Sequence, residues 1–109
     1  MPRDPGLEEL LANDLSGIRG LTQKPMFGGL AWLVHGNLLL GARENSLLVR
    51  LGKGNDAWAL KLPGVELMVM QDRPMHGWVR ANAAVYSDDA LRTRLIEAAL
   101  AFNRTLPKK

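Results

Sequence analysis

Few side chains in this sequence of 109 residues could act as a nucleophile, an acid or a base. The chain contains no cysteine, and its two histidines are His35 and His76. Acid–base or nucleophilic catalysis needs a reactive group held beside a base and an orienting partner. The acid nearest to His76 along the chain is Asp72. We therefore expect no catalytic residues and a protein that works by binding, although the sequence alone leaves an enzyme open.

Metal and cofactor sites lack their usual residues as well. Without thiolates, two histidines would need several carboxylates to build a zinc site. Gly28 and Gly29 could suggest a phosphate-binding loop, but such a loop lies between a strand and a helix N-terminus. An apolar stretch with strand character follows here instead. We expect these glycines to permit a bulge or a close backbone approach, and we expect no metal and no cofactor.

Cationic side chains are the best candidates for a binding site. Arg50 is the one charge in an otherwise apolar stretch, and Arg73 stands in a predicted turn just before a proline. Guanidinium groups recognise carboxylates or phosphates through paired donors. An internal salt bridge, for instance to Asp72 or Glu66, is the alternative for these arginines. The predicted binding residues are Lys24, Arg50, Arg73 and His76.

The formal net charge of +3 comes from the C-terminal end. Without Arg104, Lys108 and Lys109, the 14 basic residues fall to 11 and balance the 11 acidic ones. Cations at a helix C-terminus are favoured by the helix dipole. The alternative is that this basic end binds nucleic acid, which remains a second candidate function.

Length and composition indicate one globular domain spanning residues 1–109. The sequence is 47% hydrophobic and 23% charged, which is typical of folded domains. Its N-terminus has no apolar segment typical of a signal peptide. The longest apolar runs are about five residues, whereas a membrane-spanning helix needs roughly 20. We therefore expect a cytoplasmic protein without a membrane segment.

The pattern of apolar residues predicts three helices. Asp4 and Pro5 are typical of a helix start, and leucines follow at helical spacing up to about Ser16. A short helix follows Asn55 or Asp56 and carries Trp58. The last helix begins at the caps Ser87-Asp88-Asp89 and runs to about Leu106. Its predicted apolar face consists of Leu91, Leu95, Ala98, Ala99, Phe102 and Leu106.

Short apolar runs separated by glycine and asparagine predict five strands. They cover residues 30–34, 38–42, 46–51, 65–70 and about 77–81, with a turn over residues 71–74. Tight connections between such strands require antiparallel pairing. The predicted fold is a two-layer α+β domain of order α-β-β-β-α-β-β-α, with helices packed on a mostly antiparallel sheet. Ile96 and Leu100 lie off the predicted helix face, so they meet another element or a second subunit, and a homodimer is one expectation.

Four segments together resemble one known family. They are residues 24–34 with Gly36-Asn37, the tripeptide Leu48-Val49-Arg50, residues 73–79 and residues 101–108. In this order and spacing the chain resembles the N-terminal domain of the TfoX (Sxy) family, as a stand-alone member. The motif residues for which we expect a structural role are Met26, Phe27, Gly28, Gly29, Pro74, Met75, Gly77 and Trp78.

The resemblance implies an α+β domain and a link to the regulation of natural competence, in which founding members are transcriptional co-activators. It implies no catalytic residues. The leading prediction is therefore a non-enzymatic module that binds a protein partner, the transcription machinery by resemblance. The alternative is a domain that binds a small anionic ligand or nucleotide, conceivably an enzyme, through Arg50, Arg73 and His76.

Overall fold

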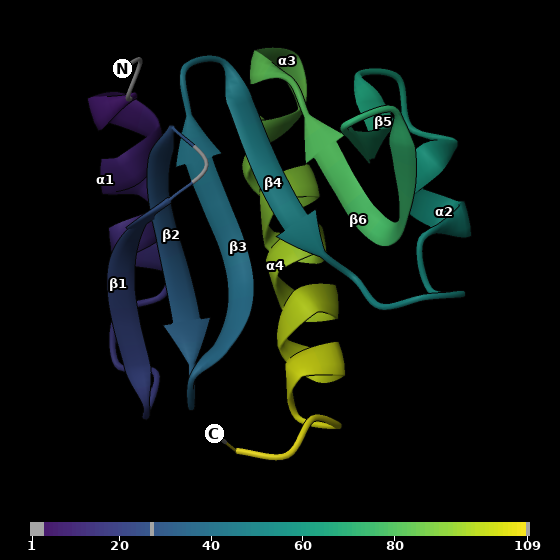
Figure 1. Ribbon diagram of the computed structural model, residues 1–109. Helices are drawn as coiled ribbons and strands as arrows, with labels where there is room; N and C mark the ends of the chain where they lie inside the picture. Colours follow the sequence, from purple (N-terminus) through teal and green to yellow (C-terminus); the bar gives the residue numbers. More distant parts are fainter. Residues whose placement is uncertain (1–3, 27, 109) are drawn as a thin grey trace.

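Six strands form one antiparallel sheet in the computed structural model, which describes residues 4–26 and 28–108 (Figure 1). The spatial order is β1-β2-β3-β4-β6-β5, so the chain meanders through four strands before a hairpin adds to the far side. The strands are β1 (Leu21–Met26), β2 (Gly29–Val34), β3 (Asn37–Arg43), β4 (Ser46–Arg50), β5 (Val65–Met70) and β6 (Arg73–Ala81).

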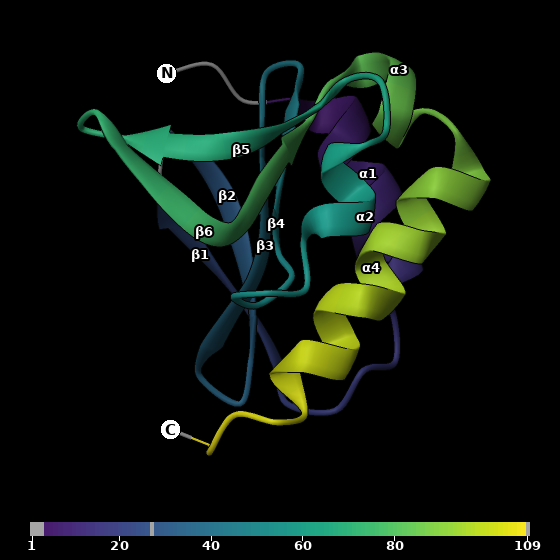
Figure 2. The same ribbon diagram turned by 90° about the vertical axis from the view of Figure 1, so that its right-hand side faces the viewer.

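The helices lie together on one face of this sheet, as the side view in Figure 2 shows. They are α1 (Pro5–Asp14), α2 (Ala57–Leu60), α3 (Ala83–Tyr86) and α4 (Asp89–Asn103). The opposite face of the sheet carries no helix among the described residues. The predicted two-layer α+β fold and the order of its elements are confirmed, and the structure adds strand β1 and the short helix α3.

Side-chain caps fix the starts of the two longer helices. The Asp88 carboxylate accepts a hydrogen bond from the Leu91 amide at 3.1 Å and so caps α4. Asp4 accepts from the Leu7 amide at 3.1 Å at the start of α1. The hydroxyl of Tyr86 also donates to Asp4, at 3.1 Å. One carboxylate therefore joins α1 to α3, two elements far apart in the sequence.

Strand β1 was not predicted, because its sequence Leu-Thr-Gln-Lys-Pro-Met lacks a run of apolar residues. It is an edge strand, and most of its side chains are exposed. Pro25, which has no N–H to donate, is tolerated in a strand that has a neighbour on one side only. Pairing with β2 rather than its own hydrophobic pattern makes this segment a strand.

Residues 71–74 were predicted as a turn, and this prediction was wrong for the last two residues. The turn consists of Gln71 and Asp72, with φ angles of 50° and 62°, and Arg73 and Pro74 already belong to β6. Two successive left-handed residues make a tight hairpin turn, usually built with asparagine, aspartate or glycine. Glutamine is unusual at the first position, so the sequence does not reveal that the turn consists of these two residues alone.

The predicted buried face of α4 was partly wrong. Leu95 and Ala99 are buried as expected, and Leu91 and Ala98 pack against the core partly buried, but the buried stripe also contains Arg92, Ile96 and Asn103. Ile96 and Leu100 pack against the domain's own core. The homodimer stays a prediction, and these two residues no longer motivate it.

The buried side of α4 differs from the predicted one partly because Arg92 is buried. Its polar partners lie with it in the helical layer. Its Nε lies 2.6 Å from an Asp14 carboxylate oxygen, and its Nη1 donates to the Tyr86 carbonyl at 2.8 Å. Asp89 forms a second ion pair at 2.9 Å. The hydrogen bond that Arg92 donates to Asp14 is the main reason that the pKa of Arg92 is raised. The network ties α4 to α1 and to the end of α3.

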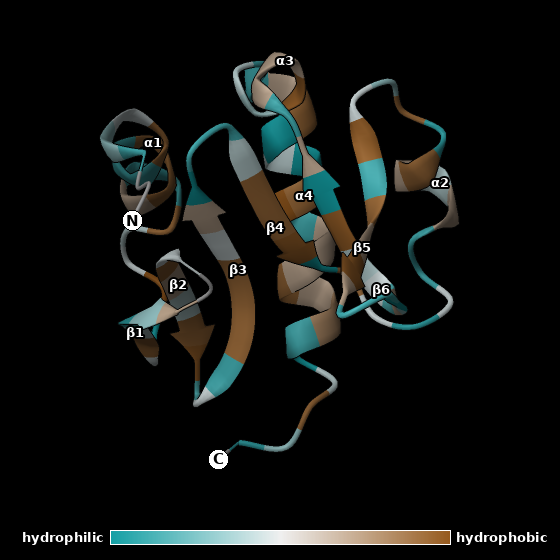
Figure 3. Ribbon diagram, turned by 45° about the horizontal axis from the view of Figure 1, so that its top comes forward, coloured by the Kyte–Doolittle hydropathy of each residue, from teal (hydrophilic) through white to brown (hydrophobic). Residues whose placement is uncertain are grey.

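The core lies between the helices and the inner face of the sheet. β3 and β4 are hydrophobic along most of their length, as the brown ribbons of Figure 3 show. In β4, Leu47, Val49 and the following Leu51 belong to the core cluster, whereas Leu48 does not. Because side chains alternate along a strand, Leu48 points to the side without helices.

Candidate functional site

The candidate site lies on the side of the sheet away from the helices, which we call the open face. Strand register assigns its residues, since Arg43 pairs with Ser46 and Arg80 pairs with Leu48. Leu48 points away from the core, so its pairing partners on neighbouring strands do so as well. The open face therefore gathers Arg43 from β3, Ser46 and Leu48 from β4, and Arg80 from β6.

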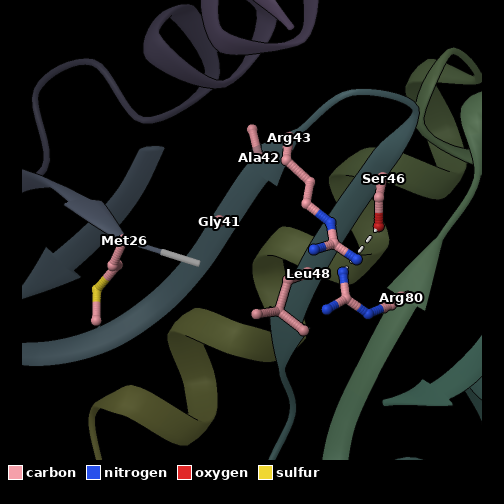
Figure 4. A pocket seen from close by; sticks show the side chains of 7 residues that line it. All are labelled: Met26, Gly41, Ala42, Arg43, Ser46, Leu48 and Arg80. Carbon is pink, nitrogen blue, oxygen red and sulfur yellow. Dashed lines mark hydrogen bonds between the residues drawn. The ribbon is translucent and has the colours of Figure 1, made fainter. Parts of the chain in front are cut away.

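Two guanidinium groups converge there, as Figure 4 shows. The side chains of Arg43 and Arg80 point toward one another beside Ser46. Nη1 of Arg80 donates a hydrogen bond to the Ser46 hydroxyl at 3.1 Å. The pair lies at a small hollow of about 10 Å³, also lined by Met26, Gly41, Ala42 and Leu48.

No carboxylate within the described chain forms an ion pair with either arginine. Burial lowers the pKa of half-buried Arg80, and the nearby positive charge of Arg43 lowers it further. Glu66 is the cross-strand partner of Arg80 in β5 but does not form an ion pair with it. Arg92, with its two carboxylates, has the opposite environment. The open face thus holds two like charges to which the described residues supply no counter-ion.

A larger depression adjoins the arginine pair. It has a volume of about 410 Å³ and shares Arg43 and Arg80 with the small hollow. Val69, with 56% of its surface exposed, is the most exposed large hydrophobic residue described. The remaining lining residues are Gly28, Met68, Met70 and Gln71. Charge and apolar surface therefore meet in one depression, which suits an anionic group carried by a partly apolar ligand.

Of the predicted binding residues, Lys24 belongs to the open face, whereas the guanidinium of Arg50 reaches Phe102 of α4. Lys24 in β1 pairs with Ala31, which pairs in turn with Gly41 at the floor of the small hollow. Arg50 lies between aromatic rings, with its guanidinium carbon 5.2 Å from the centre of the Trp78 ring and 5.3 Å from that of Phe102. This cation–π contact holds the side chain at the end of β4.

The structure does not bring the other two predicted residues to these. Arg73 pairs with Met70 beside the β5–β6 turn, whereas Arg50 pairs with Trp78 further along β6. His76 is exposed in the irregular part of β6 between these pairs. Neither Arg73 nor His76 has an ion pair or a hydrogen bond through its side chain among the described residues.

The motif residues serve mainly as backbone and packing positions. A side chain at Gly29 would overlap the Ala42 carbonyl oxygen, and one at Gly77 would come within 2.6 Å of the Gly52 backbone. The Gly77 amide donates to the Asp56 carboxylate at 3.1 Å. Pro74 pairs with Val69 where β6 has passed the end of β4. Met26 lines the small hollow, Met75 is half-buried in β6, and Phe27 lies outside the described residues.

The sequence analysis missed Arg43, Ser46 and Arg80 as site residues. Arg43 ends an apolar strand and was assigned to a turn, and Arg80 was taken as an ordinary strand residue. Their meeting depends on the pairing of β4 with β6, which are separated in sequence by α2 and β5. The one available signal was the alternation in Trp78-Val79-Arg80-Ala81. It predicts that Val79 faces the core and that Arg80 points to the other face of the sheet.

The basic C-terminal end lies beside a second cavity, of about 280 Å³. The Asn37 side chain holds this end by donating to the Pro107 carbonyl at 2.8 Å. Arg104 and Lys108 share the cavity lining with two further basic residues, Arg19 and His35. This cavity is the place where the predicted nucleic-acid or anion-binding alternative would apply.

Residues 4–26 and 28–108 provide neither a cluster of metal ligands nor a membrane-spanning helix. These residues contain no group of three or more histidine, cysteine, aspartate or glutamate side chains placed to hold a metal ion. None of their helices combines the length and apolar character needed to cross a bilayer.

Comparison with known proteins gives one match. The family model described as TfoX N-terminal domain matches residues 13–103, which covers all six strands. No curated protein and no solved structure matches the chain.

Proposed function

We propose, from the premise that this chain belongs to the TfoX N-terminal domain family, that it is a cytoplasmic regulatory module which binds a protein partner through the open face of its sheet. The partner would belong to the transcription machinery, in keeping with the competence-related role of the family. The module would act by contact and without catalysis.

The observation that carries this proposal is that two arginines meet on the helix-free face of the sheet and form no ion pair with any described residue. Arg43 and Arg80 converge with no carboxylate partner among residues 4–26 and 28–108, and exposed Val69 lines the adjoining depression. Protein interfaces combine an apolar centre with arginine, which is enriched there relative to other charged residues. The helical face is occupied by the domain's own core, so the open face is the side left for a partner.

The basic cavity at the C-terminal end supports a second candidate, the binding of nucleic acid or a small anion. Four basic residues line it, and no acidic residue does. Binding of duplex DNA there would weaken steeply as salt rises, because each neutralised phosphate releases counter-ions. A titration at 50 and 200 mM salt, compared between the wild type and Arg104→Gln, separates this candidate from protein binding.

Site-specific photo-crosslinking in the cells of origin tests the leading proposal. A photoreactive amino acid replaces Val69 in one variant and Leu60 in α2, on the helical side, in the control. Among the residues that the structure describes, these are the two exposed large hydrophobic ones. We expect one protein to crosslink from position 69 and not from position 60, and unlabelled wild-type protein to compete for it. Equal crosslinking from both positions, or none from position 69, would contradict the proposal.

A further inference from the structure

We propose that Arg43 and Arg80 form a clamp for a single carboxylate, supplied by an acidic side chain of the partner protein. The inference rests on the proposed function and adds its recognition chemistry. Guanidinium groups bind carboxylates by paired, charge-assisted hydrogen bonds. With one guanidinium on each side, a bound carboxylate would separate the two like charges and neutralise one of them.

The free charge on the open face argues for a ligand. Within the described part of the chain, the Arg80 side chain makes one hydrogen bond, to the Ser46 hydroxyl, and the Arg43 side chain makes no hydrogen bond or ion pair. A guanidinium carries five N–H donors, so most donors of this pair remain available. Arg80 holds its charge although burial and Arg43 both oppose it. An arrangement of this kind is costly without an anion and favourable with one.

The size of the hollow favours the tip of a side chain. A volume of about 10 Å³ holds about one water-sized group. A carboxylate oxygen fits that space, while the rest of an aspartate or glutamate residue would extend into the larger depression beside it. The floor of the hollow is Gly41, whose missing side chain lets a ligand approach the sheet.

The surroundings favour a peptide over a nucleic-acid backbone. Half-buried Met26 lines the hollow, and half-buried Met70 and exposed Val69 line the depression. Methionine-rich surfaces suit irregular apolar side chains of a protein partner. A nucleic acid instead needs a row of protruding cations that follow successive phosphates. The occupant we infer is a protein segment with one carboxylate flanked by apolar residues.

NMR titration at low salt tests the clamp with a defined probe. The probe is N-acetylglutamate α-amide, which carries one carboxylate, and inorganic phosphate and a short duplex DNA are titrated in parallel. We expect the probe to shift the side-chain resonances of Arg43 and Arg80, with a Kd in the millimolar range, on the order of a single ionic contact. Arg43→Gln should weaken binding at least fivefold, and the matched variant Arg73→Gln should change it less than twofold.

Several results would overturn the inference. The first is equal binding of the probe by Arg43→Gln and the wild type. A second is phosphate or DNA binding tenfold more tightly than the probe at these arginines. A third is a melting temperature for ligand-free Arg43→Gln more than about 4 °C below that of the wild type, which would give Arg43 a structural role. We expect that temperature to be unchanged or higher, because the substitution relieves repulsion.

Failure of the clamp and failure of the proposed function give different results. If the crosslink from position 69 persists in Arg43→Gln, the open face binds a protein but the clamp does not supply the contact. If the probe binds the clamp but no protein crosslinks from position 69, the anion site exists without the partner that we infer. Loss of both the probe shifts and the crosslink in Arg43→Gln, with Arg73→Gln unaffected, is the result we expect.

Discussion

Replacing Arg43 by glutamate should stabilise the protein while closing the proposed site. The side chain of Arg80 already reaches Ser46, the cross-strand partner of position 43, so a glutamate there lies within its reach. Removing a like-charge pair on the surface gains about 0.2–0.5 kcal/mol. A partly exposed ion pair gains about 0.2–1 kcal/mol more. The sum of about 0.5–1.5 kcal/mol corresponds to a rise in melting temperature of about 2–6 °C for a domain of this size.

Thermal unfolding of Arg43→Glu and Arg73→Glu at two salt concentrations provides the assay. Each substitution lowers the formal net charge from +3 to +1, so a general effect of charge is equal in both. The gain should be specific to position 43 and should shrink at 0.5 M salt, where the Debye length is only about 4 Å. An equal gain in Arg73→Glu, or a loss of stability in Arg43→Glu, would refute the argument that the two arginines repel each other.

Three further predictions concern the framework of the site. In urea unfolding, Gly29→Ala should destabilise the protein by about 1–3 kcal/mol, because its new methyl group overlaps a backbone carbonyl. The new methyl group of Gly41→Ala has its nearest contact at 3.5 Å, so this variant should change the free energy of unfolding by no more than about 0.5 kcal/mol. Arg92→Met should cost about 2–3 kcal/mol in the same assay, below the 3–5 kcal/mol of a fully buried pair, because the Asp14 side chain is 28% exposed and stays hydrated. The backbone hydrogen bond at the start of α1 lowers the pKa of Asp4 below 3.8. The stability that the ionised Asp4 carboxylate contributes should therefore be present above pH 3.8 and be lost as the pH falls through the folded-state pKa. Between pH 7 and 3, the melting temperature should fall less steeply in Asp4→Asn than in the wild type.

Segments with a hydrophobic period of their own could be predicted from the sequence, and segments defined by their neighbours could not. The start of α4 followed from Asp88, whose carboxylate needs only the amides of its own helix. Strand β1 has no such local signal, because it owes its conformation to pairing with β2, which begins at Gly29. The face of α4 lies between these cases, since the salt bridges of Arg92 with Asp14 and Asp89 bring a charged residue into the buried stripe.

The candidate site was predictable in chemistry but not in position. The sequence pointed to arginine and to anion recognition, and it proposed Arg50 and Arg73 as the residues. The structure places Arg50 between two aromatic rings and Arg73 beside a hairpin turn, and it brings Arg43 to Arg80 instead. The decisive information was the register between β4 and β6, which depends on packing along the whole sheet and on no single sequence motif.

The register of these strands also explains why the site and the core are linked. Side chains alternate along β4, so a shift by one residue would turn Leu48 into the core and Leu47 out of it. Burial of Leu47 and Val49 against the helices therefore fixes Leu48 and its partner Arg80 on the open face. The helical layer specifies the position of the arginine pair without touching it. Substitutions on the open face should for this reason change binding with little effect on folding, which makes Arg43 and Arg80 suitable positions for testing function separately from stability.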